Sequence, residues 1–578
     1  MINITINNNP FQVEDGSTIL DAAKKAGVHI PTLCHLDMHD FKMVNRVGTC
    51  RVCMVEVEGR RNLIPACSTV VAEGMVIRTN TIRAIKARRT IVELLLSNHP
   101  KDCLICERNQ NCELQSLAAE LGIREVKYQG YQSHHKKDTS SYSLIRNAEK
   151  CILCRRCETM CNEVQTVGVY SAVNRGFETV IGTAFDLPMI ETACTFCGQC
   201  VSVCPTGALT LVDNTAEVWA AIYDPEKYVI VQTAPAIRAA LGEVFQMPVG
   251  SRVTGKMTAA LRRLGFDLVC DTDFAADLTI MEEANELLDR LKNNGTLPIL
   301  TSCCPAWVKF IEHQFPDLLD IPSTCKSPHE MFGAIAKTHY AQKLGIDPEK
   351  IVVVSVMPCL AKKYEAARPE LAYGKNSAYV DYVISTRELG SMIREAGITF
   401  ADLPDEDFDS IMGESTGASV IFGTTGGVIE AALRTAVYWL TGEKLDKIDF
   451  EELRGMQGIR SATIDVQGTP VRIGIAHGLG NARALLEAVR GGEKYHAIEI
   501  MACPGGCVGG GGQPYHGNNI EIIKQRADAL YQEDKDKSIR RSHENTEIQR
   551  LYEEFLETPG SHKAHELLHT TYTKREKI

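Results

Sequence analysis

The placement of 22 cysteines constrains this chain of 578 residues more than any other feature. Residues 151–161 read CILCRRCETMC and residues 194–205 read CTFCGQCVSVCP, so both carry the spacing CxxCxxCxxxC. Iron–sulfur proteins with two [4Fe-4S] clusters use this run, and the fourth cysteine of each run binds the cluster of the other. The sequence therefore predicts two interleaved ligand sets, Cys151, Cys154, Cys157 and Cys204, and Cys194, Cys197, Cys200 and Cys161.

The first 80 residues predict a β-rich fold with a single helix. MINITINN and FQVEDG alternate as strands do, and STILDAAKKAG is a helix opened by a Ser/Thr cap. This pattern resembles the plant-type [2Fe-2S] ferredoxins, although 15 residues separate the first two ligands instead of four. A [2Fe-2S] cluster is expected on four thiolates, which would also suit zinc, namely Cys34, Cys50, Cys53 and Cys67.

A fourth site is predicted in HPKDCLICERNQNC at 99–112, from His99, Cys103, Cys106 and Cys112. One imidazole and three thiolates close a site for zinc or for a [4Fe-4S] cluster, so the residues alone do not decide. The order of the sites resembles the N-terminal region of the large iron–sulfur subunit of respiratory complex I and of iron-only hydrogenases, which favours iron. Four such clusters would form a wire for electrons.

After residue 212 the chain alternates apolar strands and helices, which indicates an α/β fold. Three segments stand out there: TSCCPAW at 301–307, MPCLAKKYEA at 357–366 and EIMACPGGCVGGGGQP at 499–514. They resemble the three signature segments of [FeFe]-hydrogenases, and the likeness runs over nearly the whole chain. It implies a multidomain α/β and α+β protein, with ferredoxin-like modules at 1–80, 81–140 and 141–212, a two-lobed α/β H-cluster domain at 213–520 and a helical segment like the small subunit at 521–578.

The same resemblance assigns the ligands of the H-cluster, a [4Fe-4S] cluster joined to a diiron unit with CO, cyanide and azadithiolate. Its thiolates would be Cys304, Cys359, Cys503 and Cys507, and Cys507 would bridge to the diiron unit. Lys362 would donate to a cyanide and Met501 would pack against the diiron unit. Gly505 and Gly506 would let the backbone approach the cofactor, and further neighbours would be Ala234, Pro235, Ala236 and Met357.

Cys303 and Cys304 are adjacent, and neighbouring side chains of an extended chain point to opposite sides. With Cys304 on the cluster, the resemblance makes Cys303 a free thiol that faces the azadithiolate amine. A thiol with a pKa near 8.5 can exchange a proton close to neutral pH. The family's path then runs from Cys303 through Glu283, Ser323 and Glu286 to Arg290 at the surface. Read alone, Glu283, Glu286 and Arg290 would be one solvated face of a helix.

The resemblance implies an enzyme that interconverts protons, electrons and H2. Its electron partner would be a ferredoxin or diaphorase-type subunits with flavin and NAD(P), and maturation enzymes would supply the diiron unit. One alternative is an H2 sensor, but sensors typically lose the thiol at Cys303 and carry signalling domains. The other is an electron-transfer subunit of the complex I type, which would lack the three segments after residue 212.

Composition excludes other classes. The net charge of -11 argues against nucleic acid as a partner, and no run of 18 apolar residues exists to span a membrane. A cytoplasmic location is expected, where cysteines bind metals and do not form disulfides. FGTTGGVIEAALR and IGIAHGLGNARALL are interpreted as strand-to-helix turns. Cys270 and Cys325 are interpreted as small core residues. Ala236 and His329 are departures from the family near the cofactor. His562, His565 and His569 are interpreted as surface or interface histidines.

Overall fold

The computed structural model describes residues 1–38, 43–45, 48–373, 377–442, 449–466, 469–517 and 519–576. Its N-terminal part is a mixed five-stranded sheet in the order β2-β1-β7-β5-β6. The expected helix forms as α1, because the Thr18 side chain caps the Asp21 backbone and Asp21 caps Thr18 in return. The elements are β1 Ile2–Ile6, β2 Asn9–Val13, α1 Ile19–Lys25, β3 Asp37–Met38, β4 Met43–Val44, β5 Met54–Val57, β6 Ile64–Pro65 and β7 Val76–Arg78.

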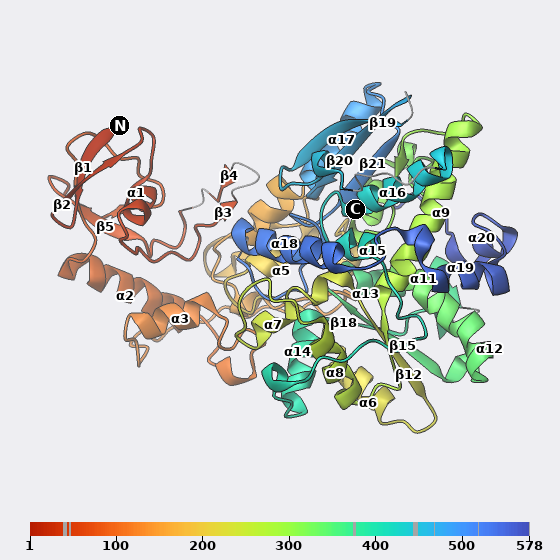
Figure 1. The fold of residues 1–578 in the computed structure, drawn as a ribbon. Helices are drawn as coiled ribbons and strands as arrows, with labels where there is room; N and C mark the ends of the chain where they lie inside the picture. The colour runs from red at the N-terminus through yellow and green to blue at the C-terminus, as the bar shows by residue number, and fades with distance from the viewer. Residues whose placement is uncertain are drawn as a thin grey trace.

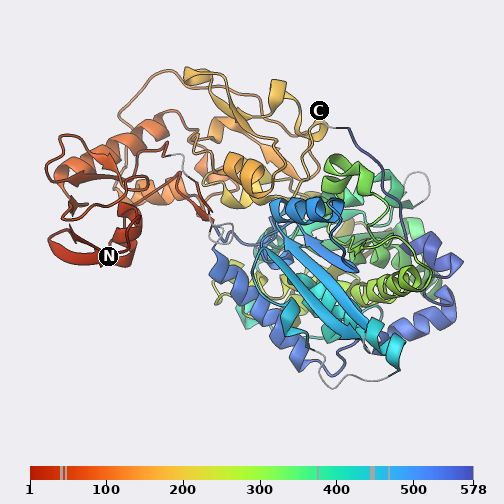
Figure 2. The ribbon, with the colours of Figure 1, turned by 90° about the horizontal axis from the view of Figure 1, so that it is seen from above.

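The next part of the chain holds two helices and then a pair of short hairpin-like ladders. Strand β8 pairs with β11 across more than sixty residues of chain, which closes residues 144–211 into one unit. Within it, β9 pairs with β10. Figure 1 shows α2 and α3 beside the N-terminal sheet, which stands apart, whereas the segment around α5 lies against the rest of the molecule; Figure 2 shows the same separation of the N-terminal part. The elements are α2 Ile82–Ser97, α3 Glu113–Glu120, β8 Leu144–Arg146, α4 Arg156–Thr159, β9 Ser171–Val173, β10 Val180–Gly182, α5 Gln199–Val203 and β11 Leu209–Leu211.

The first lobe of the C-terminal part is a parallel four-stranded sheet in the order β13-β12-β15-β18. Its central strand, IVVVSVM, is buried along its whole length, as expected for a strand covered on both faces. The elements of this lobe are α6 Thr215–Ile222, β12 Tyr228–Thr233, α7 Leu241–Val244, α8 Thr254–Leu264, β13 Leu268–Asp271, α9 Thr272–Lys292, α10 Pro305–Gln314, α11 Pro328–Ile335, α12 Ala341–Leu344, β15 Ile351–Met357, α13 Ala361–Ala366, β16 Ala372–Tyr373, β17 Ser377–Ala378, β18 Tyr382–Ser385 and α14 Thr386–Glu395.

The second lobe has a four-stranded sheet in the order β14-β21-β20-β19, in which β19 is the antiparallel edge strand. Helix α9 packs against α11 of the first lobe and α16 of the second, so it lies between the two lobes. This is the two-lobed α/β arrangement that the sequence predicted (Figure 1). The elements are β14 Ile299–Leu300, α15 Gly417–Val420, α16 Gly427–Thr441, β19 Ile459–Val466, β20 Thr469–His477, α17 Leu479–Arg490 and β21 Ala497–Met501.

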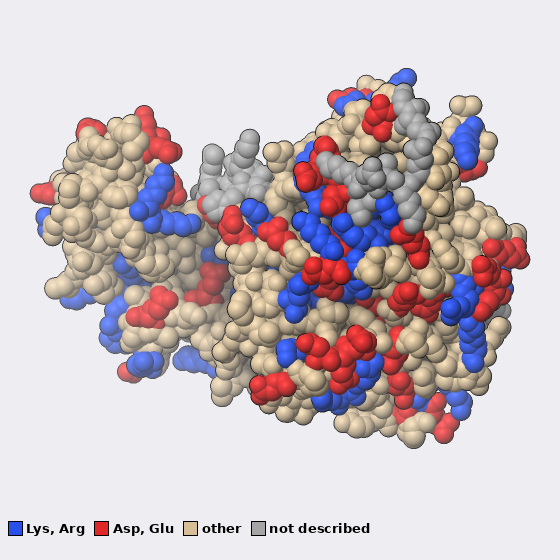
Figure 3. Space-filling view, viewed as in Figure 1, with Lys and Arg blue, Asp and Glu red and all other residues tan. Residues whose placement is uncertain are grey.

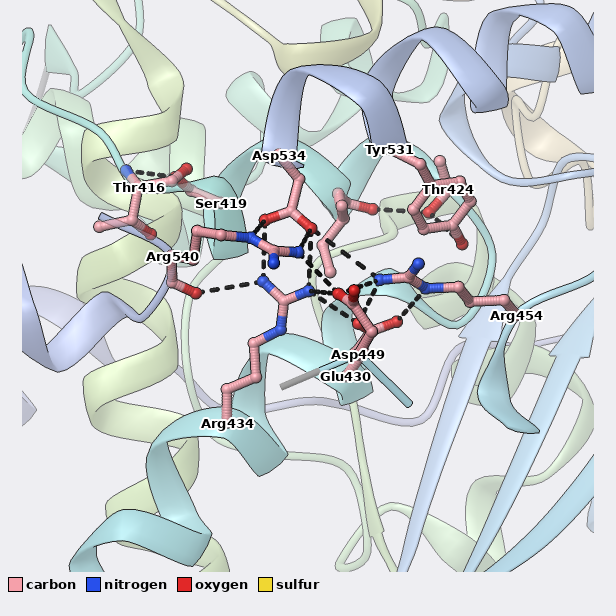
Figure 4. Close-up of polar contacts among 11 residues, drawn as sticks. Thr416, Ser419, Thr424, Glu430, Arg434, Asp449, Arg454, Tyr531, Asp534 and Arg540 are labelled. Carbon is pink, nitrogen blue, oxygen red and sulfur yellow. Dashed lines mark hydrogen bonds and ion pairs between the residues drawn. The ribbon is translucent and has the colours of Figure 1, made fainter. Parts of the chain in front are cut away.

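The C-terminal segment is helical and wraps around both lobes, as expected (Figure 1). Its helices are α18 Ile520–Asp536, α19 Thr546–Leu551 and α20 His562–Leu568. A buried ion network holds it to α16: Asp534 pairs with Arg434 at 2.9 Å and with Arg540 at 2.6 Å. Figure 4 shows the guanidinium groups turned toward the carboxylates. Because unpaired buried charges are costly, the segment and α16 are expected to fold together.

One of the two glycine-rich stretches differs from its expectation. IGIAHGLGNARALL is a strand-to-helix turn between β20 and α17. FGTTGGVIEAALR instead joins a short 3-10 turn at Ile421–Gly423 to α16, so the prediction of a preceding strand was wrong. Glycine-bounded turns look alike in sequence whether a strand or a helical turn precedes them.

Acidic and basic side chains are interspersed on the face drawn in Figure 3. Within the described part of the chain, no helix combines the length and the apolar character that a membrane crossing requires.

Candidate active site and cluster sites

Each of two cavities is lined by one of the interleaved cysteine sets. The first cavity, between α4 and β11, is lined by Cys151, Cys154, Cys157 and Cys204. The second, beside α5, is lined by Cys161, Cys194, Cys197 and Cys200. Burial raises the pKa of Cys151 and of Cys197 to about 11. Thiols with so high a pKa become thiolates when they bind a metal, so both cavities fit clusters with cysteine ligands.

The second cavity lies directly against the catalytic lobes. Gln199 donates a 3.0 Å hydrogen bond to the Gly509 carbonyl, and a Cβ on Gly198 would lie 3.2 Å from the Gly511 Cα. A Cβ on Gly510 would lie 2.2 Å from the Pro358 carbonyl oxygen. The glycine run after Cys507 is therefore needed for close packing of backbone on backbone.

The sulfurs of the four N-terminal cysteines lie close together in a series, in the order Cys50, Cys34, Cys67 and Cys53. Cys34 hydrogen-bonds with Cys50 and Cys67, which lowers the pKa of Cys34, and Cys53 hydrogen-bonds with Cys67. A [2Fe-2S] cluster takes two thiolates on each iron, so pairs of close sulfurs fit it. Four thiolates on one zinc would all lie within about 4 Å of one another. Among the described residues, two groups of three or more possible ligands lie within 4.8 Å of one another, and neither contains a cysteine of the predicted cluster sets.

His99 has the arrangement of a metal ligand. Its Nδ1 lies 2.9 Å from the Pro100 carbonyl, and its buried Nε2 has no hydrogen-bond partner. A ring nitrogen held by a carbonyl, with the other left bare, is typical of metal-binding histidines. Cys103 is exposed and Cys106 is half-buried. A Cβ on Gly207 would lie 2.6 Å from the Cys106 sulfur, so the glycine leaves room beside that thiol.

The four cysteines expected on the H-cluster come from three different segments and converge between the lobes. Cys304 precedes α10, Cys359 follows β15, and Cys503 and Cys507 follow β21. Burial raises the pKa of Cys359, and the nearby Cys304 and Cys507 raise it further. Cys197 of the second cavity is close enough to raise the pKa of Cys503. The set therefore lies next to the predicted series of accessory clusters. A group of four converging thiols also fits a [4Fe-4S] cluster.

A buried charge network lies beside these cysteines. Lys362 Nζ donates to the Cys303 carbonyl at 3.1 Å and to Glu365 at 2.6 Å. Burial disfavours the Glu365 carboxylate, but Lys362 and His329 outweigh it and lower its pKa to about 2. His329 Nε2 lies 2.7 Å from Glu365, and the acidic neighbours Glu330 and Glu365 raise the pKa of His329 against burial. Lys362 is thus a fixed cation at this wall of the site.

The remaining residues expected near the cofactor line the ends of strands. Ala234, Pro235 and Ala236 follow β12, and Met357 ends β15, all four buried. Gly505 and Gly506 have φ values of 71° and 98°, which favour glycine. A Cβ on Gly506 would lie 2.7 Å from the Thr425 backbone nitrogen and 3.0 Å from the Met501 sulfur. The structure therefore brings Met501 and this turn together.

Cys303 and Cys304 face different parts of the molecule. Cys303 packs with a small apolar cluster that contains Ile280, Phe422 and Met501. Cys304 packs with the larger cluster that contains Cys359, and its sulfur accepts a 3.4 Å hydrogen bond from the Ala502 backbone. Burial raises the pKa of Cys303 well above that of a free thiol, which corrects the expected value near 8.5. At neutral pH Cys303 is a neutral proton donor.

The residues of the predicted proton path lie close together at helix α9. Burial raises the pKa of Glu283 to about 8, against the lowering effect of the nearby Ser323 side chain. Ser323 Oγ donates to Glu286 Oε2 at 2.8 Å, and Glu286 pairs with Arg290 at 2.6 Å. Arg290 is partly exposed, with 12% of its side chain accessible, and it donates to the carbonyls of 296, 321 and 322.

Sequence reasoning missed three residues around Glu286. Thr324 donates to Glu286 through its backbone at 3.1 Å, and its hydroxyl lies 2.7 Å from His569 Nδ1. His569 Nε2 lies 3.0 Å from Glu282. The sequence offered one signal, the spacing of the C-terminal histidines. It predicted that they lie at the surface or at an interface, but not which residues they contact.

Known families match the chain from end to end. The family described as the C-terminal domain of the iron-only hydrogenase large subunit matches residues 227–511, and the iron hydrogenase small subunit matches residues 520–575. A 2Fe-2S iron–sulfur cluster binding domain matches 1–82, the NADH-ubiquinone oxidoreductase-G iron–sulfur binding region 88–127, and a 4Fe-4S dicluster domain 150–208. A subunit of an NADP-reducing hydrogenase from Solidesulfovibrio fructosivorans is 60% identical over 100% of both chains. The chain belongs to the iron-only, or [FeFe], hydrogenases.

Two other relatives agree with this membership. Iron hydrogenase 1 of Clostridium pasteurianum is 40% identical over 99% of this hydrogenase and 100% of its own length. The structure of an apo [FeFe]-hydrogenase from Chlamydomonas reinhardtii superposes with a TM-score of 0.56 at 42% identity, over 63% of this hydrogenase and 99% of that chain. The predicted fold class is confirmed, as are binding domains for 2Fe-2S and 4Fe-4S clusters beside an H-cluster domain.

Proposed function

We propose that this hydrogenase moves protons between H2 chemistry and solvent through Cys303, Glu283, Ser323 and Glu286. When bound, the H-cluster supplies the iron chemistry that splits or forms H2. The chain would hold it with Cys304, Cys359, Cys503 and Cys507. Lys362 would orient it through hydrogen bonds, and Met501 with the turn at Gly505 and Gly506 would exclude water from it.

The direction of the hydrogen bonds carries this proposal. With its pKa near 8, Glu283 is protonated at neutral pH and can donate to Ser323 Oγ. Ser323 in turn donates to the Glu286 carboxylate at 2.8 Å. A protonated donor, a hydroxyl and a carboxylate acceptor in series form a path along which a proton can hop outward. The buried Cys303 thiol is near enough to Glu283 for the carboxylate to raise its pKa further.

Electrons would take a separate path through four accessory clusters. We assign the modules to 1–80, 81–140, 141–212, 213–520 and 521–578. Three features support the ligand sets: the two lined cavities, the close pairs among Cys34, Cys50, Cys53 and Cys67, and the bare Nε2 of His99 beside Cys103, Cys106 and Cys112.

The partner is proposed to be an NADP-linked subunit that exchanges electrons at the N-terminal clusters. Support comes from the relative described as a subunit of an NADP-reducing hydrogenase, which matches over its full length. A ferredoxin that binds the same end is the alternative. Cytoplasmic location and supply of the diiron unit by maturation enzymes belong to the same proposal.

Glu286→Gln tests the proton path, because glutamine keeps the shape and cannot exchange the charge. Turnover with an artificial reductant should fall by about 10²-fold or more, the usual contribution of a positioned acid or base. The CO and cyanide infrared bands should persist. Asp289→Asn, an exposed change on the same helix, is the control and should keep full turnover. Full activity of the Glu286 variant would overturn the path.

A further inference from the structure

The proposed proton path reaches Glu286, whose side chain is mostly covered, with 15% of it exposed. Its neighbour Arg290 is held by three carbonyls and keeps its proton at all physiological pH values, so it cannot pass one on. A contacting group that can carry a proton would give this mostly covered carboxylate a route to solvent. The described side chains in hydrogen-bond contact with Glu286, apart from Arg290, are Ser323, Thr324 and the thiol of Cys325, which is buried. Ser323 leads inward, so Thr324 is the remaining outward neighbour.

Thr324 connects Glu286 to the C-terminal segment. Its Oγ1 lies 3.4 Å from Glu286 Oε2 and 2.7 Å from His569 Nδ1. The segment is fixed there by backbone bonds, since Thr570 donates to the Thr324 carbonyl at 2.7 Å and Lys326 donates to the Leu568 carbonyl at 2.8 Å. A Glu286 oxygen, the Cys325 sulfur and a His569 ring nitrogen all lie within 4.8 Å of one another. This contact is therefore built into the fold.

Glu282 sets the chemistry of His569. Its Oε2 lies 3.0 Å from His569 Nε2 and accepts from the Gly560 backbone at 2.9 Å, while Tyr552 donates to its other oxygen. This carboxylate acceptor assigns the proton of neutral His569 to Nε2 and leaves Nδ1 facing Thr324. The His565 ring lies 4.2 Å from the His569 ring and is exposed. His569 thus connects Thr324 to a surface imidazole.

We propose that His569, with His565 beside it, is the outlet through which the proton path of this hydrogenase exchanges protons with solvent. The inference rests on the proposed proton path. For an inward step, the His569 Nδ1–H bond breaks as the Thr324 O–H bond forms. The former Thr324 proton passes to Glu286 Oε2, and neutral His569 is reprotonated from His565 or water. The reverse sequence releases a proton. Histidine suits this role because its charge changes between about pH 5 and 8.

Charged groups on each packed element bear on this pair. Helix α9 contributes Glu282 and Glu286, the loop before α11 contributes Cys325, and α20 contributes His562 and His565. Burial and the neighbouring His569 lower the pKa of His565. The two rings therefore favour one shared proton over two, as a relay requires.

The test uses the full-length, fully loaded protein and an artificial reductant. His569→Gln keeps a hydrogen bond to Glu282 and cannot carry a proton, and Thr324→Val removes the hydroxyl but keeps the backbone bond to Glu286. Both should lower turnover severalfold, less than the roughly 10²-fold effect of a direct acid or base. Free imidazole should restore the rate of the His569 variant, and the pH profile should change shape. Asp289→Asn, an exposed change on α9, should match the wild type.

A second readout does not depend on turnover. The infrared band of the Glu286 carboxyl, identified by its loss in Glu286→Gln, should shift its pH midpoint in His569→Gln. Wild-type rates, pH profiles and carboxyl midpoint in both variants would overturn the outlet. If Glu286→Gln still abolishes turnover in that case, the proton path stands and only the outlet fails. If Glu286→Gln is fully active, the path itself has failed.

Discussion

The His99 module and the H-cluster site differ in how they treat their cysteines. In the His99 module Cys103 is exposed, and its neighbours Leu104 and Ile105 are 90% and 85% exposed. Between the lobes, Cys359 and Cys503 are buried, and a fixed cation and a buried carboxyl stand beside them. Electron transfer to a partner requires proximity to the surface, whereas proton chemistry requires a dry site with one polar route. The exposed His99 module is therefore suited to electron exchange with a partner, and the buried site between the lobes is suited to proton chemistry.

The largest expected effect is at the buried end. Cys359→Ala removes a proposed cubane ligand, so the H-cluster should not be retained and H2 turnover should be lost with any reductant. Of about 20 irons in the fully loaded chain, about six should be missing. Iron analysis and infrared spectra check this. Retention of the CO and cyanide bands would show that Cys359 is not a ligand.

The exposed N-terminal end should show the opposite result, with H2 turnover retained and partner-linked activity lost. Deleting residues 1–140 removes the two outer clusters and leaves the interleaved cysteine sets and the catalytic lobes. Turnover with an artificial reductant should stay within about twofold, while activity with the NADP-linked partner should fall by at least about tenfold. Cys103→Ala is the matched point variant and should lose about four irons. Unchanged partner-linked activity would place the electron exchange elsewhere.

Much of this contrast could be predicted from the sequence, because cluster ligands come in short fixed spacings. The runs at 151–161 and 194–205 predict the two sets that line the two cavities, and the cap at Thr18 predicts α1. What could not be predicted depends on contacts between distant segments. The loop at Thr324 meets His569 across more than two hundred residues, and the glycines after Cys507 pack on Gly198. No local pattern encodes either contact.

The smallest effect concerns the buried carboxyl of the proton path. Glu283 holds its proton up to about pH 8 when folded but ionises near pH 4.5 when unfolded. The folded state therefore binds more protons between these values, and stability falls as the pH rises through them. Glu283→Gln removes this penalty and should raise the free energy of unfolding by about 4 kcal/mol at pH 8, and by less than about 1 kcal/mol at pH 5. Melting temperatures at the two pH values measure it. A gain that does not depend on pH would mean that Glu283 is ionised in the fold.

The central claim is the division of labour between two adjacent cysteines, and one paired measurement tests it. Cys304→Ala should lose the H-cluster irons and all CO and cyanide bands. Cys303→Ala should keep the irons and bands with small shifts, yet its turnover should fall by about 10²-fold or more, because the thiol beside Glu283 is gone. Iron content, infrared spectrum and H2 turnover of the two variants, measured side by side, decide the matter. A Cys303→Ala protein that turns over at the wild-type rate, or that loses the bands, would contradict the account.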